Sequence, residues 1–596
     1  MCGIIGYVGS ENSLTHLIDG LRALEYRGYD SAGVAYFDGG SIRCVKAAGR
    51  LANTEALLRP GTVSHNGIGH TRWATHGAPS DVNSHPHGTS SLMLVHNGII
   101  ENYASIRAEL EALGYDFVSD TDTEVAAKLL DYYYRQESLD PTAAIAQVTS
   151  KLVGSWALGI LFTDHPDKLY AARQGSPLIV GIAESGHFIA SDITAILRRT
   201  RSYYQLDDGE IAEITASSCK ILQNGKPVAK PVLTADWDIE AAERGGFAHF
   251  MLKEINEEPS VIRQTLQNRH FDKSLLASVS RLHIVACGTA MHAGLIAKQM
   301  FGQLAKLPCE VEIASEFRYN DPLIGADDLV IIISQSGETA DSLAALRLAK
   351  QKGARTLAIV NVIGSTIARE AEQVLYTQAG PEIAVASTKA YSVQTALLTA
   401  LAISAGVARG TLSDADAKAL SDALQNRAPE AVAEVIAGAE QIRALAGCIC
   451  GHENLFFIGR GVDYCLACEG SLKLKEISYI HSEAYAAGEL KHGTISLIVE
   501  HTPVIALCTV PALFEKMVSN IRETKSRGAD VIMLAPEGID VPTDAADHII
   551  RIPAIDPRLA FLPAVTALQL LAYYTALARG CDIDKPRNLA KSVTVE

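Results

Sequence analysis

The segment LVIIISQSGETADSLAALRLAKQKG (329–353) joins an apolar run to a turn rich in hydroxyl groups and then to a helical pattern. The run 329–333 has the length and composition of a buried strand, and the Leu and Ala spacing over 340–352 predicts a helix ending at Gly353. Similar strands and helices alternate from about residue 281 onward. This alternation is typical of parallel α/β layers.

The second half of the chain contains an internal repeat. Leu282–Val285 aligns with Leu455–Ile458 at an offset of 173 residues, and the same offset pairs Gly288 with Gly461. We therefore predict two copies of one α/β domain. The copies differ after the central strand, where the second has Cys508–Pro511 in place of the hydroxyl-rich turn.

The first part of the chain has a different pattern of apolar residues. Residues 1–217 contain short apolar runs separated by glycine, which predicts many strands and few helices. Residues 218–272 include a turn-like stretch at 223–227 and a charged amphipathic piece at 248–267. We interpret this region as a connection followed by a packing helix.

Composition limits the possible functions. Lys+Arg 52 against Asp+Glu 68 gives a net charge of −16, which disfavours binding to nucleic acid or to an anionic membrane. Two uncharged stretches, 390–408 and 559–578, contain polar residues, so we interpret them as buried core helices rather than membrane spans. The N-terminus has no secretory pattern, and the 11 cysteines suggest reduced thiols. We expect a soluble cytoplasmic protein.

Several residues of the first part could support acyl transfer. Removal of Met1 would leave Cys2 with a thiol and an α-amine that can accept its proton, although Cys2 could also be a small buried residue. Asn97-Gly98 could face an oxyanion or form a hairpin turn. Arg72 and Asp122 could hold an amino-acid substrate or form surface ion pairs.

The turn after strand 329–333 could bind an anion. Hydroxyls and free N–H groups at a strand-to-helix turn favour a phosphate, and a plain helix cap is the alternative. A single phosphate fits better than a dinucleotide, because residues 286–290 lack the Gly-x-Gly-x-x-Gly spacing.

Charged residues of the second copy could move protons. Glu469, Lys473 and Glu476 share one helix face, either as a solvated ion-pair face or as a proton-transfer set. His492 is a loop histidine or a general acid/base, and Lys591 belongs to a frayed tail or forms a Schiff base.

Four cysteines near a histidine invite a zinc hypothesis: Cys448, Cys450, Cys465 and Cys468, with His452. Cys465 and Cys468 open the helix that carries Glu469 and Lys473. We therefore prefer packing thiols and expect no metal.

Five motifs of the first part occur in an order that resembles glutamine amidotransferases of the N-terminal-nucleophile type. They are MCGIIGY (1–7), LEYRGYDSAG (24–33), TRWATHG (71–77), HNGII (96–100) and SDTDTEV (119–125). The resemblance implies that Cys2 attacks the glutamine amide and that Asn97 and Gly98 form the oxyanion hole. It assigns glutamine binding to Arg72, Thr75, His76 and Asp122, and the gate of an ammonia channel to Trp73.

The duplicated half resembles a pair of sugar-isomerase (SIS) domains. With VASTKAY (385–391), EGSLKLKEISYIHSEAYAAGELKHG (469–493) and RNLAKSVTVE (587–596), the chain is similar to the isomerizing glutamine:fructose-6-phosphate aminotransferases. That family assigns the sugar phosphate to Thr289, Ser334, Gln335, Ser336, Thr339, Val385 and Ser387. His492 would open the sugar ring, Lys591 would form the Schiff base, and Glu476 would carry a proton between C1 and C2, supported by Glu469 and Lys473. Ala290 departs from the family, which commonly has Ser there.

The resemblance implies an N-terminal-nucleophile αββα sandwich followed by two doubly wound SIS α/β domains. The expected segments are an amidotransferase domain (2–217), a connection and packing helix (218–272), SIS domain 1 (273–413), a helical connection (414–445), SIS domain 2 (446–586) and a catalytic tail (587–596).

The expected reaction converts glutamine and fructose 6-phosphate to glutamate and glucosamine 6-phosphate, with ammonia passing through an enclosed channel. No cofactor is expected, because ammonia is the amino donor and the sugar carbonyl is the electron sink. The resemblance also implies a homodimer through the SIS half. The alternatives are an amidotransferase acting on another keto-sugar phosphate, a sugar-phosphate sensor without turnover, and a membrane protein.

Overall fold

The computed structural model describes residues 2–235, 244–268 and 273–594. The chain forms two compact units, one comprising Met1–Ala242 with Ala590–Glu596 and the other comprising Glu243–Leu589. The units are described separately below.

The first unit contains two antiparallel sheets. One has the strand order β15-β11-β9-β10-β1-β4-β2-β3 and the other has the order β14-β13-β12-β8-β7-β6-β5. The strands of the first sheet are β1 (Gly3–Gly9), β2 (Ser31–Asp38), β3 (Ser41–Ala48), β4 (Asn66–Arg72), β9 (Ile179–Ala183), β10 (Gly186–Ala190), β11 (Ser202–Gln205) and β15 (Leu233–Thr234). Those of the second are β5 (His87–Gly88), β6 (Leu92–Ile100), β7 (Gly154–Phe162), β8 (Leu169–Gln174), β12 (Glu210–Ile214), β13 (Cys219–Gln223) and β14 (Lys226–Pro227).

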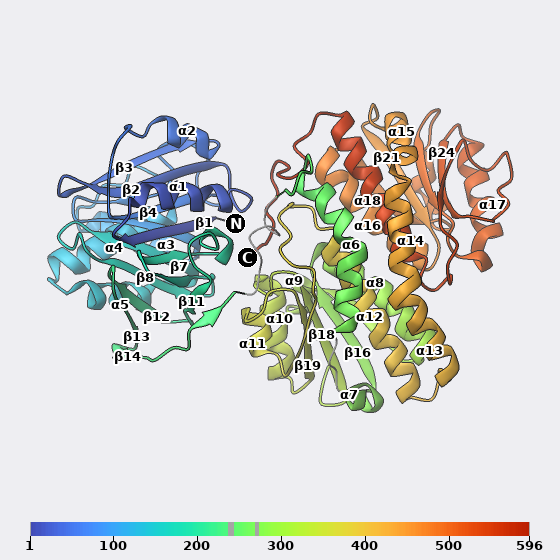
Figure 1. Cartoon of the computed structure of the whole chain (residues 1–596), viewed down its shortest axis with the longest axis horizontal. Coiled ribbons are helices and arrows are strands. Elements are labelled where there is room, and N and C mark those ends of the chain that lie inside the picture. Colours follow the sequence, from blue (N-terminus) through green and yellow to red (C-terminus); the bar gives the residue numbers. More distant parts are fainter. Residues whose placement is uncertain (1, 236–243, 269–272, 595–596) are drawn as a thin grey trace. The chain divides into compact units, whose positions relative to one another are not determined.

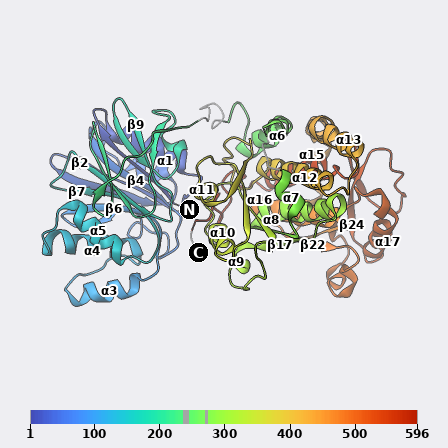
Figure 2. The same cartoon turned by 90° about the horizontal axis from the view of Figure 1, so that it is seen from below.

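Alternating side chains hold these sheets between two helical layers. Ile4 and Val95 face the core between the sheets, whereas Ile5 packs with the residues of α1, and Leu94 with those of α4 and α5. The helices are α1 (Ser13–Leu24), α2 (Leu51–Ala56), α3 (Tyr103–Ala112), α4 (Asp122–Asp131) and α5 (Pro141–Lys151). Figure 2 shows α4 and α5 on the outer face of the sheet that contains β6 and β7. The order of layers is therefore αββα, as predicted.

Strands β13 to β15 fall in the segment expected to be a connection, yet they pair with both sheets. The sheets of the first unit therefore continue beyond residue 217, because alternate apolar residues such as Ile221 still reach the core between them.

The second unit contains two five-stranded parallel sheets with the same strand order, β17-β16-β18-β19-β20 and β22-β21-β23-β24-β25. The strands are β16 (Arg281–Ala286), β17 (Cys309–Ile313), β18 (Asp328–Ser334), β19 (Arg355–Val360), β20 (Gln373–Tyr376), β21 (Asn454–Gly459), β22 (His481–Ala486), β23 (Pro503–Leu507), β24 (Asp530–Pro536) and β25 (His548–Ile552). Both sheets have the order 2-1-3-4-5 of a doubly wound fold. The shared topology confirms the predicted duplication.

Helices cover both faces of each sheet (Figure 1). One continuous core contains Ile331 of the first sheet and Phe457 of the second, together with residues of α8, α12, α16 and α18. The helices of this unit are α6 (Phe250–Gln267), α7 (Lys273–Ser278), α8 (Gly288–Met300), α9 (Ala314–Phe317), α10 (Ala340–Gln351), α11 (Thr366–Glu370), α12 (Lys389–Ala408), α13 (Asp414–Asp422), α14 (Ala428–Ala437), α15 (Ala439–Ile449), α16 (Val462–Ser478), α17 (Phe514–Lys525) and α18 (Phe561–Ala578).

Two of these helices, α12 and α18, are long and apolar enough to cross a membrane by length and composition. However, 89% of the apolar window of α12 and 83% of that of α18 are buried inside the structure. This burial is typical of core helices of a soluble protein, as the polar residues within both stretches predicted.

Candidate functional site

Cys2 lies directly before β1, where this strand meets β4. Gly3 pairs with Thr71, so the register brings Cys2 beside the end of β4. The Trp73 N–H donates to Cys2 Sγ at 3.2 Å, and the thiol lies 3.5 Å from the Trp73 carbonyl oxygen. Burial raises the pKa of the Cys2 thiol, and the hydrogen bond from Trp73 opposes this shift. A thiol kept protonated needs a nearby base before it can act as a nucleophile.

Asn97 and Gly98 lie inside β6 rather than at a hairpin turn. Asn97 Nδ2 donates to the Cys2 carbonyl oxygen at 3.0 Å, so the amide contacts the residue that carries the thiol. Gly98 has a φ of +131°, and a Cβ there would lie 1.9 Å from the Ser155 carbonyl oxygen. Glycine is therefore required at this position.

Arg72 and Asp122 are both buried, so the surface ion pairs considered from the sequence are absent at these two residues. The Arg72 guanidinium donates to the carbonyl oxygens of His76 and, at 3.0 Å, of Gly77. Asp122 begins α4 and accepts the Ile100 N–H at 2.9 Å. The charges of both residues act on the Cys2 thiol, whose pKa Arg72 lowers and Asp122 raises.

The other two residues assigned to glutamine belong to the same loop as Trp73. Thr75 is exposed and His76 is half-buried, with its ring edge-on to Tyr103 at 5.0 Å. A hydrogen bond fixes this loop, because Asp30 accepts the Ala74 N–H at 2.9 Å. This contact explains why the motifs 24–33 and 71–77 occur together.

Sequence reasoning missed His70. Its Nε2 lies 2.9 Å from the His96 carbonyl oxygen and 3.1 Å from Asn97 Oδ1. Burial lowers the pKa of His70 to about 3, so the ring is neutral at physiological pH. A histidine within the apolar strand pattern that precedes Arg72 was the available signal.

In the second unit, the hydroxyl-rich turn links the carboxyl end of β18 to α10. Ser334 Oγ lies 2.9 Å from Thr339 Oγ1 and accepts the Gly337 N–H at 3.0 Å. Ser336 Oγ accepts the Glu338 N–H at 3.2 Å, and Gln335 contributes its carbonyl oxygen to the Asn361 N–H. Thr339 precedes α10 without a side-chain capping bond, so the simple cap does not account for its hydroxyl. Hydroxyls and helix N–H groups gathered at this point can hold an anion.

Val385 and Ser387 lie on a loop that two buried carboxylates hold. Glu382 accepts the Ser387 hydroxyl at 2.6 Å and the N–H groups of Thr388 and Ala390 at 3.0 Å. Glu254 on α6 accepts the Ala384 N–H at 3.1 Å. The loop is therefore preorganised from both ends, and the sequence analysis identified neither carboxylate.

Glu469, Lys473 and Glu476 do not form a solvated face. The side chains of Glu469 and Lys473 are 0% and 1% exposed. Lys473 Nζ lies 3.6 Å from Glu469 Oε1 and 2.5 Å from Glu476 Oε2. Burial alone would lower the pKa of Lys473, but the two carboxylates raise it above its ordinary value. The ammonium is therefore held charged between them.

Thr289 donates its hydroxyl to Glu469 Oε1 at 3.2 Å, which joins the first SIS-like copy to the second. Ala290 follows in the first turn of α8 and is half-buried, without a hydroxyl to offer. His292, which the sequence analysis did not identify, lies 2.8 Å from Glu469 Oε2.

Two family models match the chain. The glutamine amidotransferase domain model matches residues 70–198, and the SIS domain model matches residues 275–404 and 449–579. The glutamine–fructose-6-phosphate aminotransferase [isomerizing] of Clostridium acetobutylicum is 49% identical over 612 residues, and that of Clostridium tetani is 50% identical over 612 residues. Both alignments cover 100% of this chain and of the relative.

This chain belongs to the isomerizing glutamine–fructose-6-phosphate aminotransferases. A solved structure described as the C-terminal domain of glucosamine-fructose-6-phosphate aminotransferase from Francisella tularensis is 36% identical and matches with a TM-score of 0.55. The match covers 58% of this chain and 100% of the chain in the solved structure.

Two further residues that the aminotransferase family assigns to the sugar site are His492 and Lys591. His492 is exposed on a 3₁₀ turn (Leu490–His492), with no side-chain hydrogen bond found within residues 2–235, 244–268 and 273–594. Lys591 lies in the terminal segment that groups with the first unit. Their roles in this family member remain predictions.

The cysteines considered for zinc make ordinary contacts. Cys448 Sγ lies 3.8 Å from His548 Nε2, and Cys465 Sγ points to the Leu295 carbonyl oxygen at 3.7 Å. In the part of the chain that the structure describes, the group able to hold a metal comprises His283, Glu310 and Glu312, and includes none of these cysteines.

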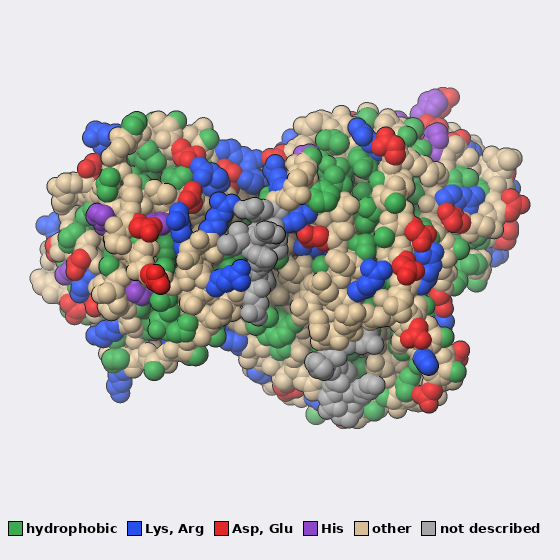
Figure 3. All heavy atoms as spheres, viewed as in Figure 1, with side chains coloured by type: hydrophobic (Ala, Val, Ile, Leu, Met, Phe, Trp, Pro, Cys, Tyr) green, Lys and Arg blue, Asp and Glu red, His purple; other side chains and the backbone are tan. Residues whose placement is uncertain are grey.

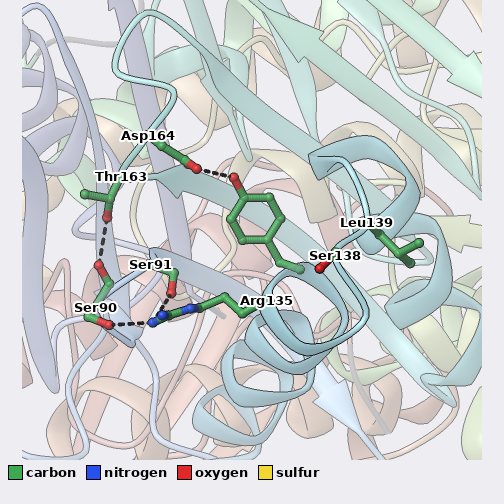
Figure 4. Close-up of a pocket in the computed structure, with 8 residues that line it drawn as sticks. Ser90, Ser91, Arg135, Ser138, Leu139, Thr163 and Asp164 are labelled. Carbon is green, nitrogen blue, oxygen red and sulfur yellow. Dashed lines mark hydrogen bonds between the residues drawn. The ribbon is translucent and has the colours of Figure 1, made fainter.

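A cavity of about 620 Å³ in the first unit contains none of the predicted residues (Figure 4). Arg135 donates to Ser90 Oγ at 3.3 Å and to Ser91 Oγ at 3.4 Å, and Tyr134 donates to Asp164 at 2.5 Å. Ser91 directly precedes β6 and Asn97 lies within it, six residues further along the chain, or roughly 20 Å of extended backbone. The cavity is therefore separate from the Cys2 site.

Proposed function

We propose that this chain converts glutamine and fructose 6-phosphate to glutamate and glucosamine 6-phosphate. Two relatives named glutamine–fructose-6-phosphate aminotransferase [isomerizing] are 49% and 50% identical to this chain over its full length, and this similarity supports the reaction. The observation that carries the proposal is that one chain has both an Asn97 amide that contacts the residue carrying the Cys2 thiol and, in the second unit, a Glu-Lys-Glu set and a hydroxyl-rich turn.

In the first half-reaction, Cys2 attacks the glutamine side-chain carbonyl and releases ammonia, and water then releases glutamate from the thioester. Removal of Met1 would supply the base, because an α-amine titrates near ~8 whereas burial raises the pKa of the thiol. Asn97 and Gly98 would stabilise the oxyanion. The residues that would hold glutamine are Arg72, Thr75, His76 and Asp122. Trp73, whose backbone N–H donates to the thiol, would gate the departing ammonia.

In the second half-reaction, the turn at Ser334–Thr339 would hold the sugar phosphate. Lys591 would form a Schiff base at C2 of the open-chain ketose, and ammonia would displace the lysine. Glu476 would then remove the C1 proton and return a proton to C2, which gives the aldose. His492 would open the ring before these steps.

The resemblance further supports a cytoplasmic homodimer formed through the SIS half, with no nucleic-acid or membrane partner. Positive and negative side chains are intermixed on the face seen in Figure 3, and the net charge of the chain is −16. We retain the six-segment domain division as part of this proposal, with the strands β13 to β15 of the connecting segment pairing with the amidotransferase sheets. Elution volume at several concentrations tests the dimer.

The decisive experiment follows glutamate and glucosamine 6-phosphate separately from glutamine and fructose 6-phosphate. Equal amounts of both products are expected, and Cys2→Ala should abolish both while leaving amino-sugar formation from an ammonium salt. Glutamate without amino sugar would point to another acceptor, and neither product would overturn the proposal. Mass spectrometry of the intact chain tests the removal of Met1.

A further inference from the structure

One turn of α8 contacts the buried carboxylate of Glu469 from two positions. Thr289 and His292 are three residues apart, so both project from the same face of the helix. The Thr289 hydroxyl reaches Oε1 at 3.2 Å, and His292 Nδ1 reaches Oε2 at 2.8 Å. Each carboxylate oxygen therefore has its own donor from α8.

This contact determines how Lys473 is shared. Its ammonium lies between two carboxylates, yet it is 2.5 Å from Glu476 and 3.6 Å from Glu469. The two donors from α8 already satisfy part of the acceptor capacity of Glu469, and the ammonium lies closer to Glu476. A cation close to a carboxylate lowers its affinity for a proton and keeps it available as a base.

We propose that His292 is a positioning residue of the isomerase reaction, which holds Glu469 so that Lys473 pairs with the proton-transferring Glu476. The inference rests on the proposed function of Glu476. His292 acts through Glu469 and Lys473 and does not touch the sugar. Its side chain is 14% exposed, whereas that of Glu469 is fully buried.

The ionisable groups described around the His292–Glu469 pair and Lys473 come from two helices and a loop. Those on α16 are Cys465, Cys468, Lys473 and Glu476, the one on α12 is Tyr391, and Glu382 on the loop before α12 also acts on Lys473. Burial, and after it the charge of Glu469, raises the pKa of Tyr391 well above its ordinary value, so the phenol stays neutral. Lys473 is therefore the cation that can redistribute when His292 is changed.

The test compares His292→Leu, which removes the donor, with His292→Asn, whose amide nitrogen can occupy the place of Nδ1. In His292→Leu, Lys473 should move toward Glu469, and Glu476 should bind its proton more tightly. We expect kcat for glucosamine 6-phosphate to fall about 10-fold, with KM for fructose 6-phosphate changed less than about 3-fold. The acid limb of the kcat profile should move upward by roughly 0.5–1 pH unit.

His292→Asn should recover most of kcat and return the acid limb to its wild-type position. His481→Leu, at a 70% exposed histidine of the same unit, is the matched control and should resemble the wild type. Glutamate formation from glutamine alone should be unchanged in all three variants. If His292→Leu does not fold, His292→Ala replaces it, because alanine also removes the donor.

A wild-type pH profile and kcat in the folded His292→Leu protein would overturn the inference, as would His292→Asn behaving like His292→Leu. A merely structural role would lower the melting temperature without moving the acid limb. If the wild-type protein formed no glucosamine 6-phosphate, the proposed function itself would fail, and this result is read before any variant is compared.

Discussion

His70 Nε2 lies 3.1 Å from Asn97 Oδ1, and Asn97 Nδ2 in turn lies 3.0 Å from the Cys2 carbonyl oxygen. The His96 carbonyl oxygen, 2.9 Å from the same His70 nitrogen, can only accept a hydrogen bond, so that nitrogen carries the proton. The proton also fixes the Asn97 amide, since its oxygen must face His70. The amide nitrogen is thereby directed toward Cys2.

Replacing His70 should therefore impair the glutaminase without removing any group that touches glutamine. We expect His70→Phe to lower kcat for glutamate formation about 10- to 100-fold, because the oxyanion donor loses its fixed orientation. The pH profile should keep its shape above pH 5, since burial already holds the pKa of His70 near 3. His165→Phe, at a loop histidine, is the control, and a His70→Phe enzyme with unchanged kcat would contradict the positioning role.

Gly98→Ala should abolish glutaminase activity. A Cβ would lie 1.9 Å from the Ser155 carbonyl oxygen, so β6 and β7 would have to separate beside Asn97. Gly114→Ala separates this contact from backbone strain, because Gly114 also has a positive φ, +91°, but has no atom within 4 Å of its added Cβ. We expect Gly114→Ala to cost about 1 kcal/mol and to retain full glutaminase activity. Equal activity of the two variants would argue against the requirement at Gly98.

Gly337→Ala should weaken binding of the sugar phosphate. Gly337 has a φ of +66°, and an added Cβ would lie 2.0 Å from Ser365 Oγ, which would distort the turn that holds Ser334 and Thr339. We expect KM for fructose 6-phosphate to rise at least 10-fold, roughly the loss of one charged hydrogen bond. Glutamate formation from glutamine alone should not change. Gly325→Ala has no atom within 4 Å of its Cβ and is the control; unaltered KM in Gly337→Ala would exclude this turn as the phosphate site.

Much of this architecture could be predicted because its signals are local. The two parallel sheets follow from apolar strands at a fixed offset, and the turn after β18 follows from a dense run of hydroxyl residues. The αββα layers of the amidotransferase part were predicted from the resemblance of its motifs to a family rather than from the periodicity of apolar residues. The extent of the sheets to Thr234 was not predicted, because β14 and β15 are only two residues long and β15 pairs with β11, about 30 residues earlier in the chain.

The positioning residues could not be predicted, because their roles arise from contacts between distant segments. Glu382 is five residues from Ser387, but Glu254 reaches the same loop from 130 residues away. His292 meets Glu469 across 177 residues. A sequence pattern identifies the groups able to do chemistry, whereas the groups that orient them become visible only when the helices pack.

Glu258 on α6 is fully buried and links three helices of the second unit. It accepts the Ser392 hydroxyl of α12 at 2.8 Å and the Thr566 hydroxyl of α18 at 2.7 Å. Burial raises the pKa of Glu258 to about 7, and the hydroxyl donors only partly offset it. The folded state therefore retains a proton that the unfolded state loses between about pH 4.5 and pH 7.

The second unit should accordingly lose stability as the pH rises through this window. Glu258→Gln should remove much of this loss of stability, because glutamine keeps both hydroxyl contacts and has no titrating proton. We expect the variant to be more stable than the wild type at pH 8 by on the order of 1–3 kcal/mol and to differ little at pH 5. Melting temperatures at both pH values measure this, with Glu500→Gln, at an 86% exposed side chain, as the control. A Glu258→Gln protein that is less stable at pH 8 than at pH 5 by the wild-type amount would show that the buried carboxylate is not the group responsible.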